Sequence, residues 1–139
     1  MDAERLRAYL LKLPHVAETM QWGANLVFWV GDKTVGGKMF ALINLDEPTG
    51  DELSGRKPRP VISYAAGPAR YPDLLEREGL IPAPYLARAH WIAALHWDAF
   101  TPTEWKAELL AAHDLILAKL PPKTRNLLAA PPAPKKPST

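Results

Sequence analysis

The sequence predicts an α+β fold, a two-layer sandwich in which N- and C-terminal helices cover one face of an antiparallel β-sheet. Three patterns predict this architecture. Apolar residues recur at helical spacing near both ends of the chain, in residues 2–13 and 101–120. Between these ends, short β-rich runs alternate with glycine-containing turns, which favours a meander of antiparallel strands. Residues 90–97 alternate along a predicted strand, so two different sets of side chains would occupy its two faces.

The first helix is expected to begin after Asp2, whose side chain is of the type that caps helix N-termini. Pro14 ends this helix, because proline lacks the backbone N–H that a helix interior needs. The apolar residues fall on one stripe and are Leu6, Tyr9, Leu10 and Leu13. We therefore expect an amphipathic helix that packs on the sheet.

A three-stranded meander is expected to follow. Its parts are the strand 18–22, the turn 23–25, the strand 26–30, the hairpin turn 31–34 and the strand 38–45. Gly36 and Gly37 allow a bend or a β-bulge before the third strand. Alternation in that strand predicts one face with Met39, Ala41, Ile43 and Leu45, and an opposite face with Lys38, Phe40, Leu42 and Asn44.

Residues 46–60 form the clearest loop, with acidic residues in the first half and basic residues in the second. Loops of this length inside a small domain are usually functional or mobile. Two interpretations remain open: a solvated loop whose halves attract each other, and a loop that presents Arg56, Lys57 and Arg59 to phosphates. After this loop we expect a strand at 61–65 and then a short helix at 67–78, which ends at a glycine.

The run 82–97 is the segment around which we expect the sheet to be organised. Pro82 and Pro84 disfavour helix and favour an extended entry. The odd positions of the strand would share one face, with Trp91, Ala93, Leu95 and Trp97, and the even positions the other, with His90, Ile92, Ala94 and His96. We interpret the tryptophan face as buried and the histidine face as partly exposed.

The last helix has the clearest local signals. Thr101 and Glu104 form a capping box, with Pro102 at the first helical position. The proline pair at 121–122 stops the helix, and residues 123–128 are expected to add one more turn.

Length and composition predict one domain, residues 1–128, followed by a proline-rich, flexible tail at 129–139. The net charge of +2 and the pI near 8.9 are far from the charge expected of a strong non-specific nucleic-acid binder. The absence of cysteine excludes disulfides, cysteine-ligated zinc and thiol chemistry. No apolar run approaches the roughly 20 residues of a membrane span, and the N-terminus lacks an apolar signal core, so a cytoplasmic protein is expected.

No cofactor, metal or catalytic site is predicted. His90 and His96 share a predicted strand face but lie about 20 Å apart along it, so they cannot bind one metal ion. His113 is expected to be a structural, hydrogen-bonded histidine, and its helical neighbour Asp114 is not expected to face it. The glycine-rich segment 31–37 joins two strands rather than a strand and a helix, which argues against a phosphate-binding loop.

Three segments of the sequence resemble motifs of the MmcQ/YjbR family. They are Gly36–Leu42, the run from Pro82 to Trp97 with its His-Trp pair, and Ala118–Lys123, in the order and spacing of that family. The resemblance extends from about Leu6 to about Leu128. The family more often has Asn-Lys before the His-Trp pair, whereas this sequence has Ala87-Arg88-Ala89, so Arg88 is the only base in that segment.

This resemblance implies a frataxin-like (CyaY-like) α+β sandwich, which in the family is often described as a double-wing DNA-binding motif. Frataxins bind iron through an acidic ridge, but the predicted first helix here mixes acidic and basic residues, so iron binding is not expected. The expected partner is double-stranded DNA, and the chain is expected to be non-enzymatic and monomeric or weakly dimeric. The residues predicted to contact DNA phosphates are Lys33, Lys38, Arg56, Lys57, Arg59, Arg88 and His90.

Two other interpretations of function remain open. One is a non-enzymatic module that binds a protein or a small ligand through its aromatic side chains, which are Trp22, Trp29, Tyr85, Trp91 and Trp97. The other is an enzyme with an unrecognised site at Arg88, His90 and His96. The positions of these side chains in the fold distinguish the interpretations.

Overall fold

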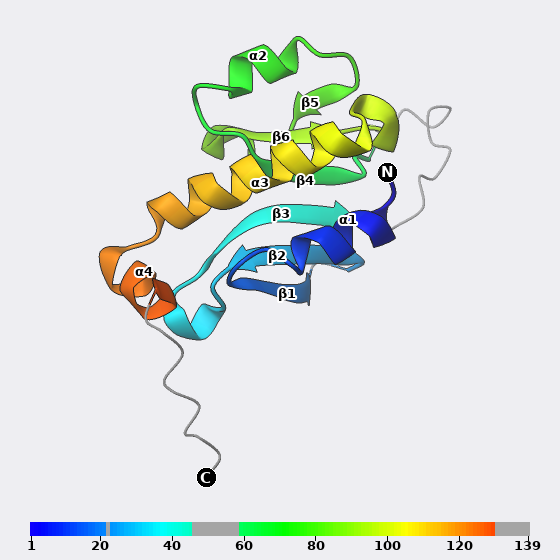
Figure 1. The fold of residues 1–139 in the computed structure, drawn as a ribbon. Helices are drawn as coiled ribbons and strands as arrows, with labels where there is room; N and C mark the ends of the chain where they lie inside the picture. Colours follow the sequence, from blue (N-terminus) through cyan, green and yellow to red (C-terminus); the bar gives the residue numbers. More distant parts are fainter. Residues whose placement is uncertain (22, 46–58, 130–139) are drawn as a thin grey trace.

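A computed structural model of the chain describes residues 1–21, 23–45 and 59–129. Within these residues, a six-stranded antiparallel sheet with the order β1-β2-β3-β4-β6-β5 packs against helices (Figure 1). The strands are β1 (Val16–Gln21), β2 (Asn25–Val30), β3 (Lys38–Asn44), β4 (Ile62–Ala65), β5 (Leu80–Pro82) and β6 (Trp91–Ala94). The helices are α1 (Ala3–Leu10), α2 (Tyr71–Leu75), α3 (Pro102–Lys119) and α4 (Pro122–Ala129), and the 3-10 turns are η1 (Lys33–Val35), η3 (Ala87–Ala89) and η4 (Trp97–Ala99). The predicted α+β sandwich is confirmed.

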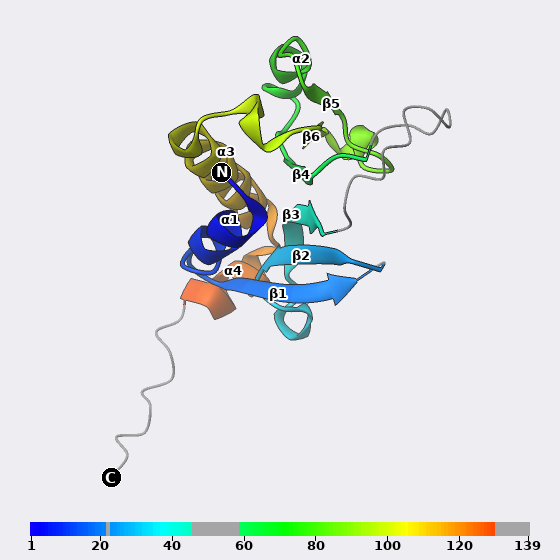
Figure 2. The same cartoon turned by 90° about the vertical axis from the view of Figure 1, so that its right-hand side faces the viewer.

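The two layers are visible in Figure 2, where α1 and α3 lie on one side of the sheet and the other sheet face is turned away from them. The strand register aligns four buried side chains across β2, β3, β4 and β6, namely Phe28, Ala41, Tyr64 and Ile92. The ring of Tyr64 meets the indole of Trp105 on α3, with the ring centroids 6.4 Å apart. This row therefore faces the helices, and the core lies between the sheet and α3.

The N-termini of α1 and α3 follow local sequence signals, whereas α1 ends at Leu10, earlier than the predicted end at Pro14. Asp2 Oδ1 accepts a hydrogen bond from the Arg5 backbone N–H at 2.8 Å. Thr101 Oγ1 accepts from the Glu104 N–H at 3.2 Å, while the Glu104 carboxylate accepts from the Thr101 N–H at 2.9 Å. Both predicted N-caps are thus confirmed. None of the described helices is long and apolar enough to cross a membrane.

A β-bulge in β3 changes the predicted faces of that strand. Phe28 pairs with Ala41 and the next residue, Trp29, pairs with Met39, so Phe40 is the extra residue of the bulge. Phe40 is buried in the core beside Ala41. The prediction that Met39 and Ala41 share a face is wrong, because the extra residue reverses the alternation between them.

The predicted long strand 90–97 is also corrected. The strand β6 covers only 91–94, because His90 adopts a left-handed conformation with φ 61 and Trp97 begins the turn η4. Ile92 faces the helices with Tyr64, whereas Trp91 lies on the other face, in the row of Ser63. The two indoles therefore do not share a face, although both contact the core. Sequence alternation could not place the strand ends, which depend on pairing with β4.

The edge strand β5 and the turn η3 were not predicted. Pro82 was expected in an extended lead and instead ends β5, which lies at the sheet edge, where proline is tolerated. The helix predicted at 67–78 is shorter, and α2 covers only Tyr71–Leu75. The prediction that Gly79 ends this helix is wrong, because the C-cap of α2 is Glu76; Gly79, with φ 85, instead turns the chain into β5.

Gly37 is expected to tolerate no side chain. A β-carbon at Gly37 would lie 1.8 Å from the carbonyl oxygen of Gly31, far inside contact distance. Gly37→Ala is therefore expected to lower the free energy of unfolding by about 1–3 kcal/mol, as overpacking does. Gly23→Asn is the matched control, because Gly23 has open space around it and a positive φ that asparagine tolerates. Urea unfolding compares the variants, and equal stabilities would contradict the close approach.

Candidate nucleic-acid interface

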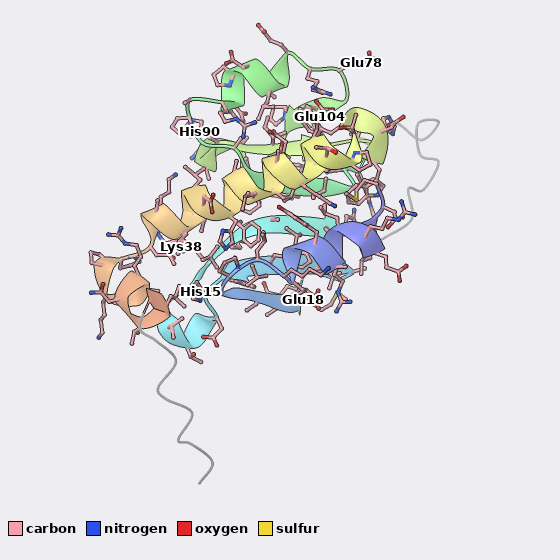
Figure 3. The ribbon with its side chains drawn as sticks, in the orientation of Figure 1. His15, Glu18, Lys38, Glu78, His90 and Glu104 are labelled. Carbon is pink, nitrogen blue, oxygen red and sulfur yellow. The ribbon has the colours of Figure 1, made fainter. Side chains whose placement is uncertain are left out.

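One end of the sheet gathers three of the residues predicted to contact phosphates. Lys38 opens β3, and His90 directly precedes β6. The strand between them, β4, runs antiparallel to both, so β3 and β6 begin at the same end of the sheet. Figure 3 labels Lys38 and His90 on this side of the molecule. Neighbouring strands lie about 4.8 Å apart, so β3 and β6 are separated by roughly 10 Å.

Arg88 and His90 are held at this end by the turn η3. The His90 carbonyl accepts hydrogen bonds from the N–H groups of Ala66 at 3.0 Å and Gly67 at 3.2 Å. Its ring is half-buried against Tyr71, with the ring centroids 5.3 Å apart. The left-handed backbone of His90 therefore has a structural role in connecting η3 to the sheet. The Arg88 side chain lies in the turn before it and is exposed.

The short helix α4 adds basic residues to the same end, because it packs on the hairpin that precedes β3. A β-carbon at Gly36 would lie 3.0 Å from Thr124 Oγ1, and one at Gly31 would lie 3.4 Å from Leu128 Cδ1. Thr124 is buried by this packing. Figure 1 shows α4 beside the hairpin, at the C-terminal end of α3.

The inward face of α4 determines which of its side chains point outward. Thr124 and Leu128 are four residues apart and form one helical face, whereas Lys123 and Arg125 flank Thr124 and are exposed. Lys119, at the end of α3, is exposed as well. We call this surface the basic end, and define it by the exposed side chains of Lys38, Arg88, Lys119, Lys123 and Arg125.

The cations of the basic end are unpaired within the described part of the chain, where none of the five forms an ion pair. Other arginines are already engaged. Arg7 lies 2.6 Å from a Glu18 carboxylate oxygen, and this hydrogen bond raises the pKa of Arg7. Arg70 pairs with Glu108, and Arg77 lies 3.5 Å from Glu104. The small net charge of the chain thus conceals a local excess of positive charge.

Asp32 is the acidic residue of the neighbouring hairpin. Its carboxylate accepts hydrogen bonds from the Thr34 hydroxyl, from the Thr34 N–H at 2.9 Å and from the Val35 N–H at 3.2 Å. These bonds lower the pKa of Asp32, the Thr34 hydroxyl most of all. Asp32 therefore stays ionised at neutral pH and reduces the positive potential beside Lys38.

The remaining predicted residues are not at the basic end or lie outside the described structure. Arg59 is exposed beyond the opposite end of β3, next to Asn44. The strand between Lys38 and Asn44 is about 20 Å long, so Arg59 and Lys38 cannot contact the same phosphate. The backbone of Lys33 lies in η1, but its side chain, like Arg56 and Lys57 as a whole, lies outside the described residues.

The two histidines suggested for an enzyme site are separated by a strand. His90 precedes β6 and the exposed His96 follows it, at the other end of the strand. His113 is structural as predicted, because Nε2 lies 2.7 Å from the Pro14 carbonyl oxygen and its ring packs against Phe40. The expectation about Asp114 was wrong, since its carboxylate reaches His113 Nδ1 at 3.1 Å. Among the described residues, no group of three or more His, Asp or Glu side chains could hold a metal ion.

Comparisons with known proteins identify the family and a similar fold. The family model described as YjbR matches residues 11–115. The crystal structure of Deinococcus radiodurans protein DR2400, with the family-model domain DUF419, is 22% identical, with 98% of this chain and 94% of that chain covered and a TM-score of 0.71. At that identity the likeness shows the fold alone. Among curated proteins the search found no match. Three cations of the basic end, Lys119, Lys123 and Arg125, lie beyond the matched residues.

Proposed function

The chain belongs to the YjbR family, and from this premise we propose that it is a non-enzymatic protein that binds double-stranded DNA through phosphate contacts at the basic end. The observation that supports the proposal is the convergence of exposed cations from the start of β3, the turn η3 and the α3–α4 corner at one end of the sheet. Exposed cations that come from several elements can each contact a different phosphate of a duplex.

Binding of this kind is positional rather than sequence-specific. Lysine and arginine contacts to phosphate fix the protein on the duplex but do not read base edges. Each neutralised phosphate releases counterions, so the affinity depends on salt. The expected dissociation constant is that of non-specific binding, about 10⁻⁴–10⁻⁶ M at physiological salt.

The salt dependence of DNA binding is the first test. With four or five phosphates neutralised, the slope of log affinity against log salt is expected to be about −4. Between about 50 and 200 mM salt the affinity should therefore fall roughly 200-fold. Fluorescence anisotropy with a labelled duplex of about 20 base pairs measures the slope. A flat salt response, or no binding even at the lowest salt, would refute the proposal.

A pair of charge-matched variants tests the location of the interface. The double variant Lys38→Gln, Lys123→Gln is expected to bind about 10-fold or more weakly at about 0.1 M salt, with a slope smaller by about 2. The control Arg5→Gln, Lys106→Gln loses the same charge away from the basic end and is expected to bind nearly as tightly as wild type. Arg59→Gln should also change the affinity by less than about twofold. Equal losses in the two double variants would show that net charge, rather than the basic end, determines binding.

A further inference from the structure

The helix α4 has an outward face with Asn126 at its centre. An α-helix turns by about 100° per residue, and Asn126 is two residues from each of Thr124 and Leu128, which form the inward face. Asn126 therefore lies about 160° around the helix from both, opposite the contact with the hairpin. Its side chain is exposed, as are those of its neighbours Arg125 and Leu127. The Asn126 amide thus points away from the rest of the described molecule.

Two side chains of this outward face contribute little to the stability of α4. Asparagine has a low helix propensity, because its side chain competes for backbone hydrogen bonds, and Asn126 lies inside a helix of 8 residues. Leu127 is 54% exposed, so its apolar side chain gains little from folding. An amide and an apolar side chain are therefore both available to a partner that contacts this face.

The charges around the outward face indicate what kind of partner it contacts. Lys123 and Arg125 lie on α4 beside Asn126, and Lys119 ends α3 just before it. No acidic residue occurs between positions 115 and 129 of the sequence. Positive charge without negative charge is complementary to a polyanion, and both edges of a DNA groove are rows of phosphates.

The dimensions of α4 match the major groove of DNA. Its 8 residues rise by about 12 Å, and an α-helix with its side chains is about 10–12 Å across. The major groove of B-DNA is about 12 Å wide and admits one α-helix. Figure 1 shows α4 at the edge of the ribbon, beyond the C-terminal end of α3, so the sheet does not block its approach to a duplex.

We propose that α4 enters the major groove, where the side-chain amide of Asn126 forms paired hydrogen bonds with an adenine. The amide N–H donates to adenine N7 and the amide oxygen accepts from the N6 amino group, a combination that no other base presents in that groove. Leu127 contacts the methyl group of a nearby thymine. This inference rests on the proposed function, and it adds a preference for A·T pairs to the phosphate contacts of the basic end.

Two duplexes of about 20 base pairs, one with A·T pairs only and one with G·C pairs only, test the preference by fluorescence anisotropy with the full chain. Wild type is expected to bind the A·T duplex about 10-fold more tightly, with the same salt slope for both because the phosphates are equal in number. Asn126→Ala should bind the two duplexes alike, with an unchanged slope. Alanine has a higher helix propensity than asparagine, so this variant is expected to keep α4.

Modified bases in the A·T duplex identify the groove. 7-Deazaadenine lacks N7 but leaves base pairing and the minor groove unchanged. It is expected to weaken the binding of wild type about 10-fold and to leave the binding of Asn126→Ala unchanged. Uracil in place of thymine removes the methyl group, which should weaken wild type about threefold and Leu127→Ala not at all.

Lys123→Gln is the control for loss of a phosphate contact. It should bind both duplexes more weakly by the same factor, with a slope smaller by about 1, and keep the 10-fold preference of about that size. Equal affinity of wild type for the two duplexes, or a preference that persists in Asn126→Ala, would overturn the adenine contact and leave the proposed function standing. No binding to either duplex at low salt would overturn both.

Discussion

Trp105→Ala is expected to lower the free energy of unfolding by about 3–5 kcal/mol, the largest single effect that the structure suggests. Trp105 on α3 is 0% exposed, and its indole N–H donates to the Trp97 carbonyl at 2.7 Å. Three aromatic rings meet it edge-on, those of Tyr64 at 6.4 Å, Trp97 at 5.5 Å and Phe100 at 4.9 Å. Alanine would leave a large cavity between α3 and the sheet and an unpaired carbonyl at Trp97.

Urea unfolding followed by circular dichroism measures this effect, because the signal does not depend on tryptophan fluorescence. Trp105→Phe is the matched comparison, since it keeps much of the ring volume and loses only the indole hydrogen bond and part of the contact. Trp105→Phe is expected to lower the free energy of unfolding by about half as much as Trp105→Ala does. Leu110→Ala, at a half-exposed position on the same helix, should cost less than about 1 kcal/mol. A cost of Trp105→Ala as small as that of Leu110→Ala would contradict the placement of α3.

Glu108→Ala is expected to lower the free energy of unfolding by about 2–3 kcal/mol. The buried carboxylate of Glu108 accepts a hydrogen bond from the Tyr64 hydroxyl at 2.8 Å and forms an ion pair with the Arg70 guanidinium. Removing it leaves the Tyr64 hydroxyl without its partner. The Arg70 side chain is 41% exposed and can be solvated, so the loss is smaller than for a fully buried ion pair.

A double-mutant cycle separates the hydrogen bond from the rest of this effect. Tyr64→Phe alone should cost about 1 kcal/mol, because it removes the donor and leaves the ring in place. In the presence of Tyr64→Phe, Glu108→Ala is expected to cost less than it does in the wild type, since no hydroxyl is then left unpaired. Strict additivity of the two changes would show that this hydrogen bond contributes nothing to stability.

Tyr64 also predicts how stability depends on pH. Burial raises the pKa of the Tyr64 phenol above its ordinary value, and the charge of Glu108 raises it further. The folded protein therefore keeps this phenol neutral at a pH where the unfolded chain ionises it, near 10. Its contribution is fully present below about pH 10 and is lost as the pH rises above that value. Wild type should lose more stability than Tyr64→Phe between about pH 9 and 11, and parallel curves would contradict this account.

The N-termini of α1 and α3 were the features of the fold that the sequence predicted best, because helix caps depend on neighbouring residues. Asp2 and the pair Thr101 and Glu104 form their caps within one turn, so spacing alone identifies them. The overall α+β class was also predictable, since apolar helices at both ends and short strands between them leave few other arrangements. The features that arise only when strands pair could not be predicted from the sequence.

Three such features explain the errors in the sheet. The bulge at Phe40 depends on how β3 pairs with β2, and it reversed the predicted faces of Met39 and Ala41. The strand β6 stops at Ala94 because its pairing with β4 and β5 stops there, although the sequence goes on alternating. The edge strand β5 is three residues long and ends in a proline, so no periodicity marks it.

The basic end was predictable only in part. Lys38, Arg88 and His90 were chosen from the sequence, but only the antiparallel order of β3, β4 and β6 brings them to one end of the sheet. Lys123 and Arg125 were missed, because their exposure depends on the packing of Thr124 against the distant hairpin. The i, i+4 spacing of Thr124 and Leu128 could have indicated an inward face, and with it the outward direction of both basic residues.

We propose that the basic end, and no other described surface, contacts DNA phosphates. Amide chemical shifts of the full chain, titrated with a short duplex at low salt, test it most directly. The account predicts the largest changes at Lys38, at Arg88 and along residues 119–125, with the amides of Arg59 and Tyr85 unaffected. Changes centred on Arg59 and Tyr85, or no change anywhere on addition of excess duplex, would contradict it.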